Sequence, residues 1–89
     1  MRPARDKNEP EIIAALERFG YHVIRIHDAS PPGAPDLIAS KGGKVFLIEV
    51  KSDRGRFSSS QERMFEIHPI YVLRSVEDVI VLLDEPRRY

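Results

Sequence analysis

The sequence predicts a single α/β domain whose elements follow the order α-β-β-β-α-β-α, with a mixed central sheet and helices on both faces. Three observations predict it. An apolar stripe at helical spacing comes first, a Gly42-Gly43 pair between two apolar runs then indicates a hairpin, and a short helix separates that hairpin from another apolar run. A strand–helix–strand crossover is right-handed and joins parallel strands, so antiparallel and parallel pairs are expected in one sheet.

The chain is short, and its 89 residues are expected to form one domain over 1–89, with residues 1–7 flexible. A domain of this size buries only about 60–65% of its unfolded surface, so oligomerisation or a well-packed sheet has to stabilise it. The absence of cysteine excludes disulfides and thiolate metal sites and is compatible with a reducing cytoplasm. No long apolar run predicts a signal peptide or a membrane span. The formal net charge of zero decides little about a polyanionic partner.

The first helix is predicted over about residues 9–19. Asn8 is its expected N-cap, and Glu11 follows three positions later at the capping-box spacing. Gly20 is a natural terminator. Residues 21–27 alternate in polarity and indicate a strand, and the proline-rich segment 28–35 is a loop.

The hairpin places two acids opposite each other. If Gly42-Gly43 is a two-residue loop, Lys41 pairs with Lys44, and Asp36 pairs with Glu49. Directly opposed residues of an antiparallel pair share one face, with Cβ atoms ~4.5–5.5 Å apart. Both strands are apolar on both faces, so we expect the hairpin to be a central piece of sheet covered on each side.

Two opposed carboxylates repel each other unless a cation lies between them. Lys51 follows Glu49 by two positions and therefore lies on the same face. An acid pair with an adjacent lysine is the equipment of a metal-dependent site that cleaves phosphodiester bonds. The alternatives are that Asp36 is an ordinary loop-end residue and that Lys51 is only a salt-bridge partner. Glu49 is harder to dismiss, because a buried unpaired carboxylate in an apolar strand costs several kcal/mol.

The second helix is predicted to open at about Ser58 and to end before His68-Pro69. Ser58 with Gln61 fits the capping-box spacing, and so does Ser59 with Glu62.

Residues 70–73 indicate the fourth strand, and residues 75–78 are expected to cap a last helix. The run over 79–83 is apolar all round and β-branched, which leaves it ambiguous between helix and strand. We favour helix.

At this point the chain resembles a known superfamily. Pro35-Asp36, twelve intervening residues and then Glu49-Val50-Lys51 are similar to the PD-(D/E)xK motif of restriction-endonuclease-like proteins, whose core has the order α-β-β-β-α-β. Glu11 matches the acid that many members carry before the first strand, and residues 61–65 resemble a Gln-x-x-x-aromatic signature. The compact size, the loop over 33–36 and the segment 71–78 resemble a stand-alone VRR-NUC (virus-type replication-repair nuclease) domain.

The acid pair and the resemblance together imply a DNA endonuclease whose cofactor is Mg²⁺, with Mn²⁺ as a substitute. Asp36 and Glu49 would ligate the metal directly, the resemblance adds the backbone carbonyl of Val50, and Glu11 would ligate through water or bind a second ion. Lys51 would orient the attacking water and stabilise the transition state. Glu11 has the alternative of a capping residue.

Gln61 would position Lys51, the attacking water or the DNA; alternatively it is only a capping residue. Phosphate contacts supply most nucleic-acid affinity, and Lys51, Arg54, Arg56 and Arg74 are the candidates for them. The arginines at 54 and 56 have the alternative of solvated loop charges, and Arg74 that of a structural residue.

The resemblance further implies a homodimer that cuts branched DNA such as four-way junctions, in the cytoplasm of a bacterial or phage-infected cell. The apolar run over 79–83 also invites a partner chain. Two alternatives stay open. One is a nucleic-acid-binding module with a vestigial acid pair, and the other is a nuclease with a different DNA or RNA substrate. The short chain leaves little room for a sequence-reading domain, which favours structure-directed cutting.

Overall fold

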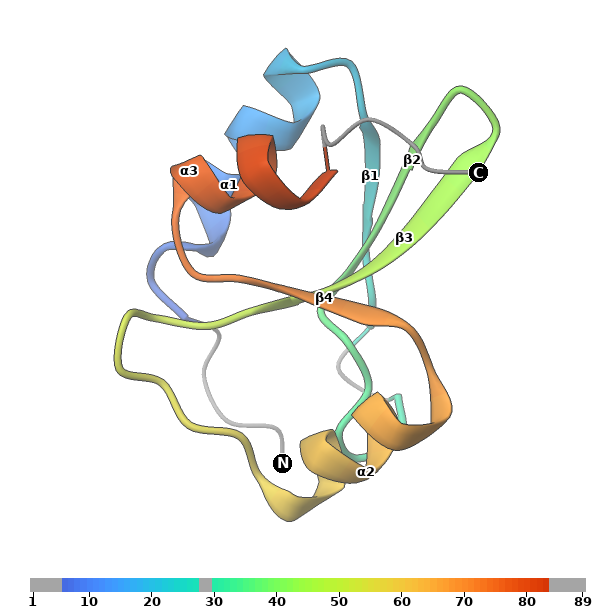
Figure 1. Cartoon of the computed structure of the whole chain (residues 1–89), viewed down its shortest axis with the longest axis vertical. Coiled ribbons are helices and arrows are strands. Elements are labelled where there is room, and N and C mark those ends of the chain that lie inside the picture. The colour runs from blue at the N-terminus through green and yellow to red at the C-terminus, as the bar shows by residue number, and fades with distance from the viewer. Residues whose placement is uncertain (1–5, 28–29, 84–89) are drawn as a thin grey trace.

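The computed structural model describes residues 6–27 and 30–83, and side chains up to residue 81. Residues 1–5 of the stretch expected to be flexible, and residues 28–29 of the predicted loop, lie outside the described part. The predicted order of elements is confirmed (Figure 1), with a short π-helical segment, η1, directly after the last helix. The elements are α1 (Glu9–Arg18), β1 (His22–Arg25), β2 (Leu37–Lys41), β3 (Lys44–Val50), α2 (Ser59–Ile67), β4 (Ile70–Leu73), α3 (Val76–Asp78) and η1 (Val79–Leu83).

The four strands form one mixed sheet in the order β1-β2-β3-β4. The first two pairings are antiparallel, and β3 pairs with β4 in parallel, as the crossover through α2 requires. Lys41 pairs with Lys44 and Ile38 with Leu47, which confirms the predicted hairpin register. Gly42 and Gly43 have φ values of +59° and +79°, the left-handed conformations that a two-residue hairpin loop of this type needs.

The core lies on one face of the sheet. Side chains of β2, β3 and β4 pack there against the apolar stripe of α1 and against Val79. The aromatic rings of Tyr21, Phe46 and Tyr71 extend this layer through successive edge-to-face contacts, with centroids 5.9 and 5.5 Å apart. Figure 1 shows α3 and η1 beside α1, whereas α2 stands apart from them. The buried apolar residues are Ile12, Ala15, Leu16, Tyr21, Leu37, Ala39, Ile48, Val50, Leu73 and Val79.

The opposite face is only partly covered. A row of apolar residues crosses all four strands, because Ile24 pairs with Ile38, Ile38 with Leu47, and Leu47 with Ile70. We call these four residues the apolar row. Ile24 is 50% exposed, and nearby Val45 on the hairpin is 66% exposed. Helix α2 reaches this side but buries none of its own residues. The expectation that the hairpin is covered on both faces therefore holds for one face only.

The helix ends differ from the expected capping. Asn8 occupies the N-cap of α1, but its side chain makes no capping hydrogen bond, so the predicted box with Glu11 is wrong. At the other end Gly20 terminates α1 as predicted, with φ of +91°, and Nζ of Lys41 also donates to the carbonyl of Phe19 at 2.6 Å. Ser75 likewise makes no side-chain cap, and the carboxylate of Asp78 instead accepts from the backbone N–H of Arg74.

The last element is helical rather than extended, as favoured, but it is not uniformly exposed. Val79 is 1% exposed and belongs to the core, whereas Ile80 and Val81 are 48% and 57% exposed.

Because the core lies on one face of the sheet, we expect truncation of an isoleucine to alanine to cost more stability on that face than on the other. Ile48→Ala removes a side chain that is fully buried, and we expect a loss of ~2–5 kcal/mol in the free energy of unfolding. Ile24→Ala is the matched control on the open face, and we expect it to cost less than ~1 kcal/mol. Urea unfolding at low protein concentration measures both. Equal losses would mean that the apolar row is packed against its own chain.

Candidate active site

Three acids are the buried polar or charged residues in the part of the chain that the structure describes. Glu9, Asp36 and Glu49 are 2%, 7% and 3% exposed. A buried carboxylate is costly unless hydrogen bonds, cations or a metal compensate for its desolvation. Asp36 directly precedes β2 and Glu49 is the second-last residue of β3, so two of the three lie at the same end of the hairpin.

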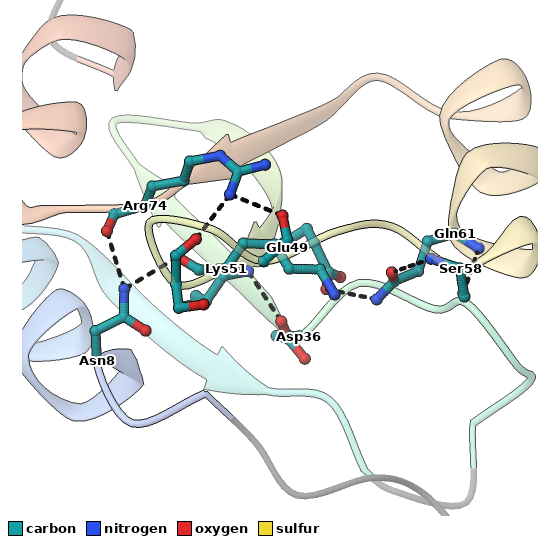
Figure 2. Close-up of polar contacts among 10 residues, drawn as sticks. Asn8, Asp36, Glu49, Lys51, Ser58, Gln61 and Arg74 are labelled. Atoms are coloured by element: carbon teal, nitrogen blue, oxygen red, sulfur yellow. Dashed lines mark hydrogen bonds and ion pairs between the residues drawn. The ribbon is translucent and has the colours of Figure 1, made fainter.

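The regular pairing of the hairpin stops one residue before the acids. Its last pair is Leu37 with Ile48, so Asp36 and Glu49 do not form the regular cross-strand pair that the register predicted. The backbone of Asp36 instead bonds to the segments on both sides of it. Its N–H donates to the carbonyl of Ile48 in β3 at 2.9 Å, and its carbonyl accepts from the N–H of Ile26, just after β1, at 2.8 Å. Because the backbone N–H of Val50 has no ladder partner there, the Oδ2 atom of Asp36 accepts from it at 2.9 Å (Figure 2).

Lys51 lies next to Glu49 without forming a tight bridge. Its Nζ is 3.9 Å from Oε2 of Glu49, and its side chain is 15% exposed. Charge-assisted N–H···O bonds are usually ~2.7–2.9 Å long, so this pair is a loose one. An ammonium group that lies beside a carboxylate without a short hydrogen bond to it can still bind a third group. The geometry of Lys51 suits such an interaction better than a purely structural salt bridge.

Gln61 makes two separate contacts with its amide (Figure 2). Its Oε1 accepts from the backbone N–H of Ser58 at 2.9 Å, and its own backbone N–H donates to Oγ of Ser58 at 3.2 Å, which completes the predicted capping box. Since Oε1 must be the acceptor in this box, Nε2 is turned toward β3, where it donates to Oε2 of Glu49 at 2.7 Å. Gln61 is therefore more than a cap, and its partner is Glu49. The alternative box from Ser59 does not form.

The loop before Asp36 touches the start of α2. Gly33 has φ of +83°, and a Cβ atom there would lie 2.4 Å from the carbonyl oxygen of Ser60. Only glycine allows this approach at that backbone conformation. The contact sets α2, and with it Gln61, at a fixed distance from the segment that carries Asp36.

Glu9, rather than Glu11, is the inward-facing acid of α1. Glu11 is exposed, whereas Glu9 is buried and its Oε2 lies 3.5 Å from Nε of Arg25. Arg25 pairs with Leu37, the neighbour of Asp36, so this contact places Glu9 toward the same end of the sheet. Sequence reasoning selected Glu11 because it resembles the acid that many family members carry before the first strand, and it missed Glu9. The missed signal is that Glu9 extends the apolar stripe of Ile12 and Leu16 by one turn.

Asn8 ties the start of α1 to the strands of the site. Its Nδ2 donates to the carbonyls of Lys51 at 3.1 Å and Arg74 at 3.0 Å (Figure 2). This use of the side chain explains why Asn8 does not cap its own helix. The first turn of α1 is therefore held at the residue that follows β3.

Arg74 shapes the loop that follows Lys51. Its Nη1 donates to the carbonyls of Ser52 at 2.7 Å and Gly55 at 3.0 Å, with a longer contact of 3.4 Å to Asp53. These bonds favour the structural role among the alternatives for Arg74. Arg54 and Arg56 lie exposed on the same loop.

The candidate metal ligands of the site are few, and all of them are oxygen atoms. Within residues 6–27 and 30–83, no group of three or more His, Cys, Asp and Glu side chains could hold a metal ion. Two carboxylates nevertheless fit Mg²⁺, which is usually bound through one or two carboxylates and keeps several waters and substrate oxygens as its other ligands. Asp36, Glu49 and the carbonyl of Val50 remain the candidate ligands for such an ion.

The model of the archaeal Holliday junction resolvase (Hjc) family matches residues 3–80. The chain belongs to this family. As an Hjc-family protein it is a metal-dependent, structure-specific nuclease that hydrolyses phosphodiester bonds.

A solved structure described as a VRR_NUC domain has the same fold, with a TM-score of 0.71 and 22% sequence identity over 90% of this chain and 98% of the other. The resemblance that the sequence suggested is thereby confirmed. No curated protein matches the sequence. Among the described residues of this Hjc-family chain, no helix is long and apolar enough to cross a membrane.

The approach of the loop to α2 predicts that Gly33 tolerates no side chain. Gly33→Ala adds the clash with Ser60 to the strain of a positive φ, and we expect a loss of ~2–4 kcal/mol in the free energy of unfolding. Gly42→Ala is the matched control, because its φ is also positive and a Cβ atom added there would meet nothing within 4 Å. We expect ~1 kcal/mol there. Urea unfolding compares the two, and equal losses would show that backbone strain alone matters.

Proposed function

We propose that this chain is a Mg²⁺-dependent DNA endonuclease, with Mn²⁺ as a substitute, that cuts four-way junctions as a homodimer. The observation that carries the proposal is the burial of Asp36 and Glu49 at one end of the hairpin, beside Lys51. Membership of a family of Holliday junction resolvases supports the substrate.

Asp36, Glu49 and the carbonyl of Val50 would hold the divalent ion. When bound, it polarises the scissile phosphate and activates a water molecule for attack. The protein prepares the two carboxylates for this task. The N–H of Val50 fixes Oδ2 of Asp36, and the amide of Gln61 fixes Oε2 of Glu49. Ligands held by other groups in this way need little reorganisation when the substrate arrives.

Lys51 would act on the phosphate itself. Its Nζ lies beside Glu49 at 3.9 Å and is mostly shielded from solvent, so its charge is available to a phosphate oxygen that enters the site. There it orients the attacking water and offsets the negative charge that grows in the transition state. Gln61 acts indirectly, because its amide binds Glu49 and not the substrate.

Glu9 replaces Glu11 as the proposed contribution of α1. Its burial and its contact with Arg25, which pairs with the neighbour of Asp36, support this, whereas Glu11 is exposed. A role for Glu9 through an ordered water or a second ion is consistent with a carboxylate kept inside the molecule at this point.

DNA phosphates would be contacted by Lys51 in the site and by Arg54 and Arg56 on the loop after it. Both arginines are exposed, and Arg74 holds the carbonyls of this loop. Such contacts give affinity without reading sequence, which suits an enzyme that recognises DNA shape. The proposed location is the cytoplasm of a bacterial or phage-infected cell, which the absence of cysteine supports.

The homodimer is proposed to form over the open face of the sheet. The apolar row and Val45 lie there, and a small domain with an uncovered apolar face gains most from a partner. Val79 of η1 is not available for such a contact, because it is buried in the core. A twofold dimer presents two active sites, one for each strand to be cut.

The catalytic proposal predicts that isosteric changes abolish cleavage and preserve the fold. Asp36→Asn keeps an oxygen that can accept from Val50, Glu49→Gln removes one charge, and Lys51→Met keeps the apolar stem. We expect each to lower the cleavage rate of a labelled four-way junction by at least ~10²-fold in Mg²⁺. Circular dichroism checks the fold. Near-normal turnover of any variant would remove that residue from the mechanism.

The same assay decides between the two acids of α1. Glu9→Gln is expected to slow cleavage, and Glu11→Gln, its matched control two residues away, to leave the rate unchanged.

A panel of junction, flap, duplex and single-stranded substrates in Mg²⁺, Mn²⁺ or chelator tests the substrate and the metal. Junction binding without cleavage, together with no divalent-ion binding by calorimetry, would instead support the binding-module alternative.

The dimer proposal predicts that one charge on the open face separates the subunits. Ile24→Asp is expected to lower the mass in light scattering from that of a dimer to that of a monomer, because an unpaired carboxylate would have to be buried. Ile80→Asp, a comparably exposed isoleucine on η1, is the control and should leave the dimer intact. A wild-type chain that is monomeric at working concentration would contradict the proposal.

A further inference from the structure

Phe57 has no part in the function proposed above, yet two cations of the site face its ring. Nζ of Lys51 lies 5.7 Å from the ring centroid, and Cζ of Arg74 lies 5.4 Å from it. Both distances are within the range in which a cation is attracted to an aromatic face. The ring is half-buried, so this attraction is less screened than at the surface.

The ring is itself held in place from two sides. Phe65 of α2 contacts it edge to face, with centroids 4.8 Å apart and planes at 89°. Arg74 binds the carbonyls of Ser52 and Gly55, which lie in the loop between Lys51 and Phe57. The position of the ring is therefore set by α2 and by the loop together.

The stem of Lys51 runs along the same loop. A Cβ atom added at Gly55 would lie 3.2 Å from Cδ of Lys51, which shows how closely the backbone of the loop approaches the stem. A lysine side chain has many rotamers, and most of them would take Nζ away from Glu49. The loop confines the stem, and the ring attracts the ammonium group at its end.

We propose that Phe57 is a positioning residue that holds the ammonium group of Lys51 beside Glu49. The proposal rests on the catalytic role proposed for Lys51. Helix α2 then organises both halves of the site, because Gln61 holds Glu49 while Phe65 supports the ring beneath Lys51. The residues of one short helix thus set the distance between the carboxylate and the ammonium group.

The inference is tested first without DNA. Lysine labelled at its ε-carbon gives an NMR signal for Lys51, assigned by its loss in Lys51→Arg. A ring current from Phe57 should displace the ε-CH₂ signal of Lys51 from that of exposed Lys44. Phe57→Leu should return it to the value of Lys44, and Phe57→Tyr should preserve the displacement. Phe19→Leu, which removes an aromatic ring elsewhere, should leave it unchanged. A signal that Phe57→Leu does not move overturns the proposal.

Cleavage kinetics on the junction then test the consequence. A misplaced catalytic group lowers the rate within the complex, so Phe57→Leu should lower kcat by about 10-fold with KM within about twofold, and Phe57→Tyr should restore kcat. Phe65→Leu, which keeps the ring of Phe57 but removes its support from α2, should give a smaller loss of kcat and replaces Phe57→Leu if that variant does not fold. An unchanged kcat in Phe57→Leu overturns the positioning role. A wild-type chain that cleaves no DNA overturns the proposed function, whereas the NMR signal alone decides whether the ring holds the ammonium group.

Discussion

The burial of two carboxylates at one end of a four-stranded sheet is the constraint on which the rest of the structure depends. Asp36 and Glu49 are almost without solvent, and water can no longer stabilise their charges. Each one receives a hydrogen bond from a donor that another part of the chain supplies, the N–H of Val50 for Asp36 and the amide of Gln61 for Glu49. These hydrogen bonds offset part of the cost of burying two charges in so small a domain.

Helix α2 contacts the candidate site and contributes no buried residue to the core. It buries none of its residues, so apolar packing does little to hold it. It is placed instead by local contacts: the capping box of Ser58 and Gln61, the bond to Glu49, and the close approach of Gly33 to Ser60.

The open face of the sheet and the small core belong together. One layer of side chains between α1 and the sheet carries most of the apolar burial, and the apolar row on the other side is only partly covered, with Ile24 50% exposed. Dimerisation over that face would complete a second layer and bring two sites into one particle. Stability and the symmetry of the cut would then come from the same interface.

The sequence by itself determined the order of elements, the hairpin register and the candidates for the centre of the site. These depend on signals that are local in the chain: helical spacing, the Gly42-Gly43 turn, and an acid pair with Lys51 at a fixed separation. Only the tertiary structure decided that Glu9 and not Glu11 faces inward, that Gln61 holds Glu49, and that Arg74 binds loop carbonyls. The physical reason is that these depend on how a helix or strand end is rotated and placed against its neighbours. For Gln61 and Arg74 no pattern within one element carries that information, whereas for Glu9 its helical spacing from Ile12 and Leu16 carries part of it.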